Sequence, residues 1–387
     1  MQDFRSLYAA YDVFPSAKGA ATHIHHFAGS LLTHYPDGLL WVLGDEELPE
    51  KEIWQNGFIQ RVFLQEKEFL HRTERYSEEL AFALKKMPHL QIVHFRDIWS
   101  GVPILANPNK NYKTIFEVNA LPSIELSYRY EVSGKVLTQI QHLENFCLEQ
   151  CDKIVAPSEV IRGFLLKKGV ASEKICVISN GAEIPLPQER PQEAPERYVI
   201  YFGALQSWQG VDTLLRAFRL LQDLDIFLVI CASHKPRFCK RYHKFAEKLG
   251  LQEKIIWRYR LPKNELSAWV QHALCSVAPL KECSRNLEQG CSPLKILESM
   301  AVGTPVIASD MPVVREIIEN ESLGKLIRAD RPMELARAIR IWNAYPYKAQ
   351  EIGRNAQKYI REHFTWEQKK IALLKLYQEL LTSKVYH

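Results

Sequence analysis

Hydrophobic and polar positions form two kinds of segment along the chain. Short apolar runs are typical of strands buried on both faces, and longer segments with apolar residues every three or four positions are typical of helices. In the N-terminal half, the predicted strands are 39–43, 91–95, 114–118 and 153–156, and the predicted helices include 70–87 and 123–150. In the C-terminal half, the predicted strands are 198–202, 226–230, 275–278 and 305–308. This alternation predicts two α/β domains in tandem, each built on a parallel sheet.

A proline-rich segment separates the two halves. Residues 185–195 contain four prolines among polar residues, and such a segment can continue neither a helix nor a central strand. We therefore predict an N-terminal domain over 1–184, a linker over 185–195 and a C-terminal domain over 196–363. The last segment, 364–383, has a helical pattern, and we expect it to pack back on the N-terminal domain and complete it.

Composition narrows the class of protein. The chain has 387 residues, 47% hydrophobic and 25% charged, which is typical of a globular multidomain protein. It has no apolar run of 18 residues and no signal-peptide pattern at its start. Its eight cysteines show no metal-binding spacing, so we expect reduced thiols and a cytoplasmic location. A peripheral contact with the inner membrane face stays open.

Charge is distributed unevenly between the halves. Residues 1–190 hold 20 Lys and Arg against 24 Asp and Glu, a net charge of −4. Because the whole chain carries +5, residues 191–387 carry 5 − (−4) = +9. The second half therefore suits an anionic ligand. No concentrated basic stripe or nucleic-acid-binding module is evident in the sequence, so we favour a small phosphorylated ligand and expect no nucleic-acid partner.

The sharpest local motif begins at Gly290, in the sequence GCSPLKILESMAVGTPV. Ser292 is predicted to cap a helix and Pro293 to be its first residue, with Gly303 ending the helix before a strand. The backbone N–H groups of Leu294 and Lys295 would then point away from the helix start. Such a start is an anion-binding site built from backbone alone.

Two side chains of this helix extend the hypothesis. Lys295 can add positive charge beside a phosphate, and Glu298, three residues further on the same face, can accept hydrogen bonds from paired ribose hydroxyls. The alternative is an ordinary capped helix with a surface Lys and Glu.

Several other residues near the N-terminus are candidate binding residues. Gly19 follows the first strand and would let backbone amides approach a phosphate, although a plain turn explains it equally well. No G-x-G-x-x-G fingerprint follows a predicted strand, which argues against a nicotinamide or flavin dehydrogenase. The three histidines of the predicted first helix are more readily core and surface residues than zinc ligands; they are His23, His25 and His26.

Two groups of charged residues have competing interpretations. Asp223 and Asp225 form an Asp-x-Asp sequence, which resembles a metal-binding motif. They lie in a predicted turn, however, where two solvated acids are expected without any metal. His94, Arg96 and Asp97 end a predicted strand, at the sheet edge where ligands of parallel sheets bind. They could contact an acceptor or form a structural salt bridge.

Five motifs in order resemble one family. Besides the Ser292-Pro293-x-Lys295-x-x-Glu298 pattern, they are SAKGAATH at 16–23, VAPSE at 155–159, ISNGAE at 178–183 and FGALQSWQGV at 202–211. Together they resemble the retaining GT-B glycosyltransferases of the GT4-like group (glycosyl transferases group 1). The resemblance covers nearly the whole chain. It implies an α/β GT-B fold, with two tandem Rossmann-like parallel-sheet domains facing across a cleft.

Four positions depart from the family pattern. The first acid of the family's Glu-x7-Glu pattern is Gly290 here. The two cations that commonly clamp the diphosphate fall on Ala204 and Gln209. The frequent catalytic-region His maps to Asn119, which can orient a sugar but cannot act as an acid or base.

The resemblance implies a set of roles. Asn119, Lys295 and Glu298 would carry catalysis. The donor would be bound by the following residues as well as by Lys295 and Glu298: Gly19, Ala20, Gly203, Ser207, Gln209, Gly290, Ser292, Pro293 and Leu294. The implied enzyme is a hexosyltransferase that moves a sugar from a nucleotide-diphosphate sugar, with a UDP-sugar favoured, to a glycan or lipid-linked acceptor in polysaccharide or glycoconjugate synthesis. It would retain anomeric configuration and need neither metal nor other cofactor.

Two other functions stay open. A GT-B-fold epimerase or phosphorylase would share the architecture, because a fold alone does not fix the reaction. A catalytically impaired scaffold that binds nucleotide sugars would explain the four departures.

Overall fold

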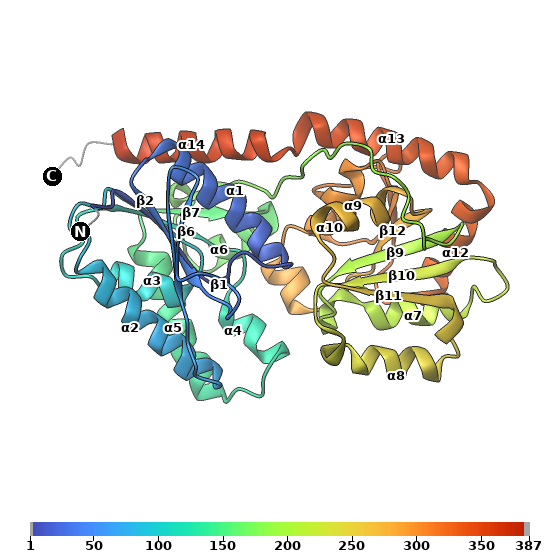
Figure 1. The fold of residues 1–387 in the computed structure, drawn as a ribbon, viewed down its shortest axis with the longest axis horizontal. Coiled ribbons are helices and arrows are strands. Elements are labelled where there is room, and N and C mark those ends of the chain that lie inside the picture. The colour runs from blue at the N-terminus through green and yellow to red at the C-terminus, as the bar shows by residue number, and fades with distance from the viewer. Residues whose placement is uncertain (1–2, 383–387) are drawn as a thin grey trace. The chain divides into compact units, whose positions relative to one another are not determined.

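The computed structural model describes residues 3–382, which divide into two compact units (Figure 1). The first unit holds the chain up to Ser16, then Ala20–Ser179, and the final segment from Lys369 onward. The second unit holds Ala17–Gly19 and Asn180–Gln368.

The first unit is built on an eight-stranded sheet in the order β3-β4-β2-β1-β5-β6-β7-β8. All neighbours pair in parallel except β3 and β4, an antiparallel hairpin at the edge that the apolar pattern did not predict. The strands are β1 (Ser6–Val13), β2 (Gly38–Leu43), β3 (Lys51–Trp54), β4 (Gly57–Val62), β5 (Ile92–Phe95), β6 (Lys113–Glu117), β7 (Lys153–Ala156) and β8 (Ile175–Val177).

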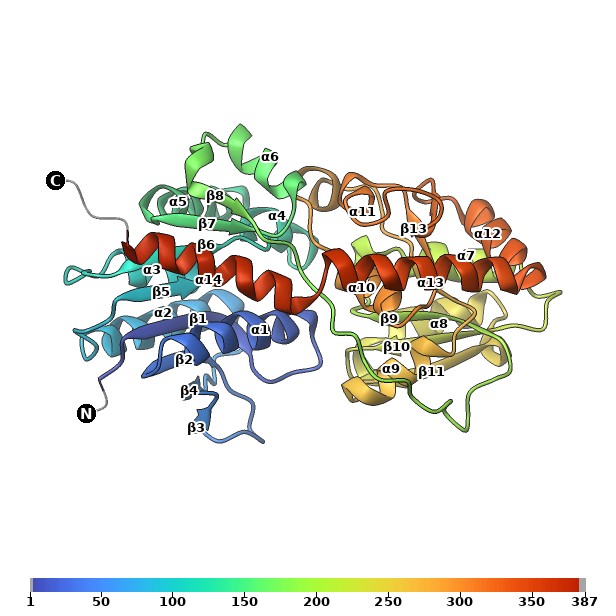
Figure 2. The same cartoon turned by 90° about the horizontal axis from the view of Figure 1, so that it is seen from above.

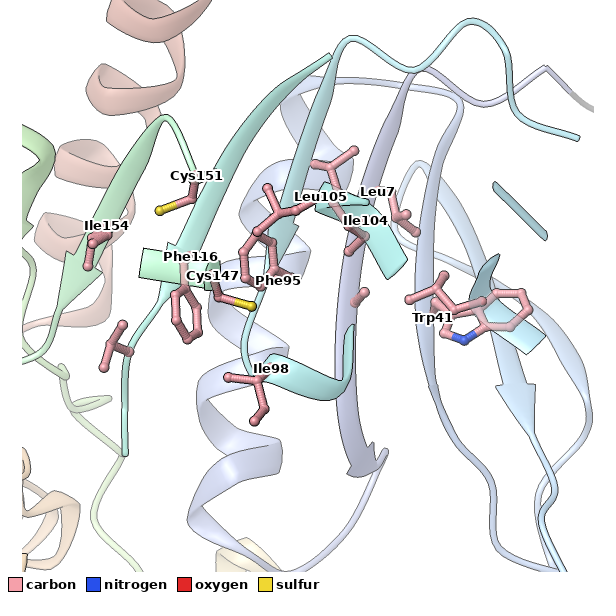
Figure 3. Packing of buried hydrophobic residues seen from close by; sticks show 14 of the residues in the cluster. Leu7, Trp41, Phe95, Ile98, Ile104, Leu105, Phe116, Cys147, Cys151 and Ile154 are labelled. Carbon is pink, nitrogen blue, oxygen red and sulfur yellow. The ribbon is translucent and has the colours of Figure 1, made fainter. Parts of the chain in front are cut away.

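Helices cover both faces of this sheet (Figures 1 and 2). They are α1 (Gly19–His34), α2 (Phe69–Leu84), α3 (Ile98–Leu105), α4 (Pro122–Glu125), α5 (Gly134–Gln150), α6 (Glu159–Lys167) and, from Lys369 onward, α14 (Trp366–Thr382). On one face, apolar residues of α2, α3, α5 and α6 pack against alternate strand residues such as Leu7, Phe95 and Phe116. Figure 3 shows the part of this core that α3 and α5 form with these strand residues. The alternation of strand side chains between two covered faces explains the uninterrupted apolar runs.

The prediction of one helix over 123–150 is wrong. Leu126–Tyr128 form a 3-10 turn after α4, and Ser133 starts a new helix by accepting a hydrogen bond from the Val136 N–H at 3.4 Å. The carboxylate of Glu144 in α5 binds the N–H and hydroxyl of Ser123 in α4, each at 2.7 Å. These contacts fold α4 back toward α5, which a continuous helix would not allow.

The second unit contains a six-stranded, wholly parallel sheet in the order β11-β10-β9-β12-β13-β14. Its strands are β9 (Tyr198–Gly203), β10 (Phe227–Ala232), β11 (Ile255–Tyr259), β12 (Cys275–Ala278), β13 (Val306–Ser309) and β14 (Lys325–Ile327). Its helices are α7 (Val211–Arg219), α8 (Lys240–Lys248), α9 (Lys263–Gln271), α10 (Leu294–Ala301), α11 (Pro312–Arg315), α12 (Pro332–Ala344) and α13 (Pro346–His363). The predicted fold class, two α/β parallel-sheet domains, is confirmed.

The last helix begins with a reciprocal cap. Thr365 Oγ1 accepts the Gln368 N–H at 3.4 Å, and Gln368 Oε1 accepts the Thr365 N–H at 3.0 Å, which is a capping box. Further along α14, Tyr377 is fully buried in the first unit, where the helix lies beside α1 (Figure 2). Within residues 3–382, no helix is both long and apolar enough to cross a bilayer.

Candidate functional site

In the second unit, the carboxyl end of β9 lies against the side chain of Lys295. The strand ends at Gly203, whose φ of +111° favours glycine. A Cβ built there would lie 3.8 Å from Lys295 Cε. The following loop contains a 3-10 turn, Ser207–Gln209, in which Ser207 is exposed. Gly203, at the carboxyl edge of the sheet, and Lys295, in the first turn of α10, are therefore neighbours.

The ammonium of Lys295 is held inside this site. Its Nζ donates a hydrogen bond to Gln209 Oε1 at 2.5 Å and lies 4.0 Å from the ring centroid of Tyr201. Burial lowers the pKa of Lys295 to about 7, because desolvation disfavours the charged form. An anion arriving beside Nζ would restore the protonated form.

Glu298 lies one turn further along α10. Burial raises the pKa of its carboxyl to about 7, while Lys263 opposes that rise and Glu183 adds to it. Lys263 is itself engaged, since its Nζ lies 2.6 Å from Glu183 Oε2. Lys295 and Glu298 thus both have a pKa near neutrality, a pattern common at functional sites.

The start of α10 differs from the prediction by one residue. The helix begins at Leu294, Pro293 is in the N-cap position, and no side chain caps it. Ser292 is not the cap, because its hydroxyl accepts the Asn180 N–H at 3.2 Å and its carbonyl accepts Asn180 Nδ2 at 2.8 Å. The first N–H groups of the helix have no acceptor within it, so the anion-binding character remains. Gly303 ends the helix at φ +80°, as predicted.

The segment before α10 is irregular. Residues Arg285–Gln289 form a π-helix, and Gly290 follows with φ 81° and ψ −173°, a conformation almost restricted to glycine. The guanidinium of Arg285 lies 5.0 Å from the ring centroid of Trp208, the neighbour of Gln209. The sequence pattern did not reveal Arg285, because no periodicity or motif links it to Trp208, 285 − 208 = 77 positions earlier. The side-chain amide of Asn286 donates a hydrogen bond to the Trp208 carbonyl at 3.0 Å and brings the two segments together.

The first unit contains a buried carboxylate at the carboxyl end of its sheet. Glu117 ends β6 and is 1% exposed. Its Oε2 accepts the Tyr8 hydroxyl at 2.7 Å, and its Oε1 accepts Arg96 Nε at 3.1 Å and a bond from Asn119 Nδ2. Arg96 Nη1 also donates to the Ala20 carbonyl at 3.3 Å. The predicted residues Asn119 and Ala20 are therefore joined through Arg96 and Glu117.

Two histidines complete this group, which we call the Glu117 cluster (Glu117, Tyr8, His23, His94, Arg96 and Asn119). His23 Nδ1 lies 3.2 Å and His94 Nε2 lies 3.4 Å from the carboxylate oxygens. Burial opposes ionisation of Glu117, but His23, Arg96 and His94 outweigh it and hold its pKa below the ordinary value. Burial lowers the pKa of His23 to about 3, so this ring is neutral at pH 7. His94 Nδ1 bonds to the Tyr377 hydroxyl at 2.7 Å.

Other charged residues singled out from the sequence cap a helix or form a surface ion pair. Asp97 caps α3 by accepting the Ser100 N–H at 2.8 Å, and Asp223 forms a two-pronged pair with Arg340 on the surface. His26 is buried and His25 is exposed. Among the residues that the structure describes, no group of three or more His, Cys, Asp or Glu side chains is arranged to hold a metal ion.

Known proteins share both sequence and fold with this chain. Residues 17–184 match the family described as Glycosyltransferase Family 4, and residues 185–359 match Glycosyl transferases group 1. A lipopolysaccharide core biosynthesis mannosyltransferase of Rhizobium leguminosarum bv. viciae is 28% identical over 60% of this chain and 66% of its own length. A D-inositol 3-phosphate glycosyltransferase of Streptomyces bingchenggensis is 25% identical over 59% of this chain and 53% of its own. The match thus spans less than two thirds of the length of these relatives.

Solved structures resemble the chain over nearly its whole length. A sucrose-phosphate synthase from Thermosynechococcus elongatus aligns with a TM-score of 0.80 at 18% identity, covering 98% of this chain and 100% of that one. An Anabaena protein solved with UDP-glucose aligns with a TM-score of 0.77 at 15% identity, covering 97% and 100%. At such identities the likeness establishes the fold, which is GT-B. With both family descriptions matched in order along the chain, it belongs to the GT4-like group 1 glycosyltransferases.

Proposed function

We propose that this glycosyltransferase uses a nucleotide-diphosphate sugar, with a UDP-sugar favoured, and that the start of α10 binds its diphosphate. The observation that carries the proposal is the meeting of Gly203, Gln209 and Lys295 at the carboxyl edge of the sheet. A glycine without a side chain, a helix start and the ammonium of the half-buried Lys295 together suit a phosphate. The Anabaena structure with UDP-glucose supports the choice of donor.

In this proposal each residue has one role. Lys295 neutralises the departing phosphate, Glu298 accepts hydrogen bonds from the ribose hydroxyls, and Asn119 orients the sugar. Fixed dipoles aimed at the charge that develops on the leaving group are expected to be the largest catalytic term. Gly19, Ala20, Ser207, Gly290, Ser292, Pro293 and Leu294 complete the proposed donor site.

The proposed reaction retains the anomeric configuration and proceeds without a metal. The bond from the anomeric carbon to the phosphate oxygen breaks, and a bond from the acceptor oxygen forms on the same face. The acceptor proton passes to the departing phosphate. The proposed acceptor is a glycan or a lipid-linked saccharide in polysaccharide or glycoconjugate synthesis, and the proposed location is cytoplasmic with a peripheral membrane contact.

Two experiments test the proposal. A thermal-shift screen of nucleotide sugars should identify one that stabilises the protein by roughly 2.7 kcal/mol at 100 times its dissociation constant. Transfer with that donor and a panel of saccharide and glycolipid acceptors, analysed by NMR, should give a product of unchanged anomeric configuration, with the same rate in excess chelator. Binding without turnover on any acceptor would favour the scaffold alternative, and an altered free sugar nucleotide without acceptor would favour an epimerase.

A further inference from the structure

Helices α7 and α8 lie on the same face of the second unit's sheet, below β9, β10 and β11 in Figure 1. A hollow of about 600 Å³ lies against both helices. Its lining contains five cations and one carboxylate; the residues are Asp212, Arg216, Lys240, Arg241, Tyr242, Lys244, Phe245 and Lys248. This hollow takes no part in the donor site described above.

The cations of α8 form a line. Lys240, Lys244 and Lys248 are four residues apart and so lie on one face of the helix, spread over about 12 Å at 1.5 Å per residue. Arg216, from α7, lies with its guanidinium 5.7 Å from the ring centroid of Phe245. The charges are therefore spread along a strip and do not converge on a point.

None of these charges is balanced locally. Within residues 3–382, Arg216, Lys240, Arg241, Lys244 and Lys248 form no ion pair, and all five side chains are exposed. The single carboxylate of the hollow, Asp212, is already neutralised by Lys281, whose Nζ lies 2.6 Å from its Oδ2. A concentration of like charges without partners is unfavourable unless an anion compensates it.

The segment around α8 accounts for the chain's charge. Residues 235–248 contain six Lys and Arg and one Glu, so they carry 6 − 1 = +5, equal to the formal net charge of the whole chain. The prediction that the chain has no concentrated basic stripe is therefore wrong. It failed because these cations are interleaved with aromatic and aliphatic residues, and only the helix brings them to one face.

An exposed aromatic residue lies at the start of this segment. Phe238 is 63% exposed, in the 3-10 turn Pro236–Phe238 that precedes α8. The guanidinium of Arg237 lies 4.8 Å from the centroid of its ring. An exposed ring beside clustered cations is the combination that lets a protein surface contact both headgroups and the apolar boundary of a bilayer.

We propose that the basic strip of α7 and α8, together with Phe238, binds the phosphate headgroups of an anionic lipid bilayer. A single small anion would need converging, fixed donors, whereas the strip offers separate flexible ammonium groups along about 12 Å of helix. Phe238 supplies an apolar contact that a soluble phosphate could not use. This inference deepens the membrane contact proposed above. It can fail while the transferase proposal stands, because vesicle binding is measured without donor or acceptor.

The test compares two charge-matched triple variants of the full chain. K240E/K244E/K248E reverses the charge of three lysines of the strip. K348E/R354E/K358E reverses the charge of three exposed residues of α13 in the same unit. Each changes the formal charge from +5 to −1, since 5 − 6 = −1. The probe is phosphatidylcholine vesicles that contain phosphatidylglycerol. The strip variant should partition onto them about 100-fold less than the unchanged protein, since each lysine contributes about fivefold. The α13 variant should lose far less of its vesicle binding.

A second variant separates the apolar contribution. F238A should weaken vesicle binding severalfold, and the binding it retains should be lost more completely in high salt, because only electrostatic attraction would remain. Equal loss in the two triple variants would overturn the assignment, since it would reflect net charge alone. Tight binding of inorganic polyphosphate or RNA by a protein that does not bind the vesicles would also overturn it, in favour of a soluble polyanion.

Discussion

Asn180 holds Ser292 at two points, although the two residues are 112 positions apart in sequence. The backbone N–H of Asn180 binds the serine hydroxyl, and its side-chain amide binds the serine carbonyl. Asn180 is 5% exposed, and its neighbour Gly181 is so close to Trp366 that a Cβ would lie 2.7 Å from the Trp366 nitrogen. The loop before α10 is therefore fixed by a segment remote in sequence.

This contact predicts a coupled effect on donor binding. Asn180→Ala and Ser292→Ala should each weaken UDP-sugar binding by about 1 kcal/mol, since each removes one neutral hydrogen bond that positions the helix start. The double variant should lose less than the sum, because the two residues act on the same loop. Isothermal titration calorimetry measures all three. Strict additivity would mean that the contact does not position the site.

Replacement of Glu298 should affect the nucleotide. Glu298→Ala should weaken UDP binding by about 1.5 to 3 kcal/mol, the usual size for hydrogen bonds to a charged group. Glu282, which is exposed in the loop before the π-helix, gives a matched control, and Glu282→Ala should leave the affinity nearly unchanged. If the Glu298 variant binds UDP like the unchanged protein, the ribose assignment fails.

The pKa values near 7 of Lys295 and Glu298 predict opposite effects of pH on the affinity for the UDP-sugar. A bound diphosphate favours protonated Lys295, so its contribution to UDP-sugar affinity falls as pH rises above about 7. Ribose hydroxyls favour ionised Glu298, so its contribution rises as pH increases through about 7. In Glu298→Gln the UDP-sugar affinity should only fall with increasing pH, and in Lys295→Met it should only rise. In each variant the affinity should change by at most about tenfold per pH unit. Calorimetry between pH 5.5 and about 8.5 checks this, and flat profiles in both variants would contradict it.

The Glu117 cluster should contribute strongly to stability. Glu117→Ala leaves Arg96 facing a buried gap and should lower the free energy of unfolding by about 3 to 5 kcal/mol at pH 7. Because the folded-state pKa of Glu117 is depressed, its contribution is fully present above the unfolded pKa of about 4.3 and is lost progressively as pH falls from there through the folded-state pKa. Urea unfolding at pH 7 and at about pH 4 should therefore show a smaller difference between the two proteins in acid. An equal difference at both pH values would refute the role of the carboxylate charge.

Gly290 should not tolerate a side chain. Gly290→Ala is expected to cost about 1 to 3 kcal/mol of stability, because φ 81° with ψ −173° is strained for any other residue. Gly163 in α6 is the control: a Cβ there meets nothing within 4 Å, and Gly163→Ala should stabilise the helix by up to about 1 kcal/mol. Thermal unfolding of both variants provides the comparison, and a neutral Gly290→Ala would show that the loop can rearrange.

The periodicity of the sequence by itself determined the two α/β units, eight of the fourteen strands in their sheets, and the helix that carries Lys295 and Glu298 and ends before Gly303. Those features depend on residues a few positions apart, whose spacing follows the helix or strand period. Only the tertiary structure decided which polar groups meet. Tyr8 binds Glu117, 109 positions away in sequence, because β1, β5 and β6 are consecutive strands of the sheet. Ser292 does not cap α10, because its hydroxyl accepts a hydrogen bond from Asn180. The local pattern also could not reveal that the cations of α8 lack partners, because that depends on which carboxylates the fold brings near them.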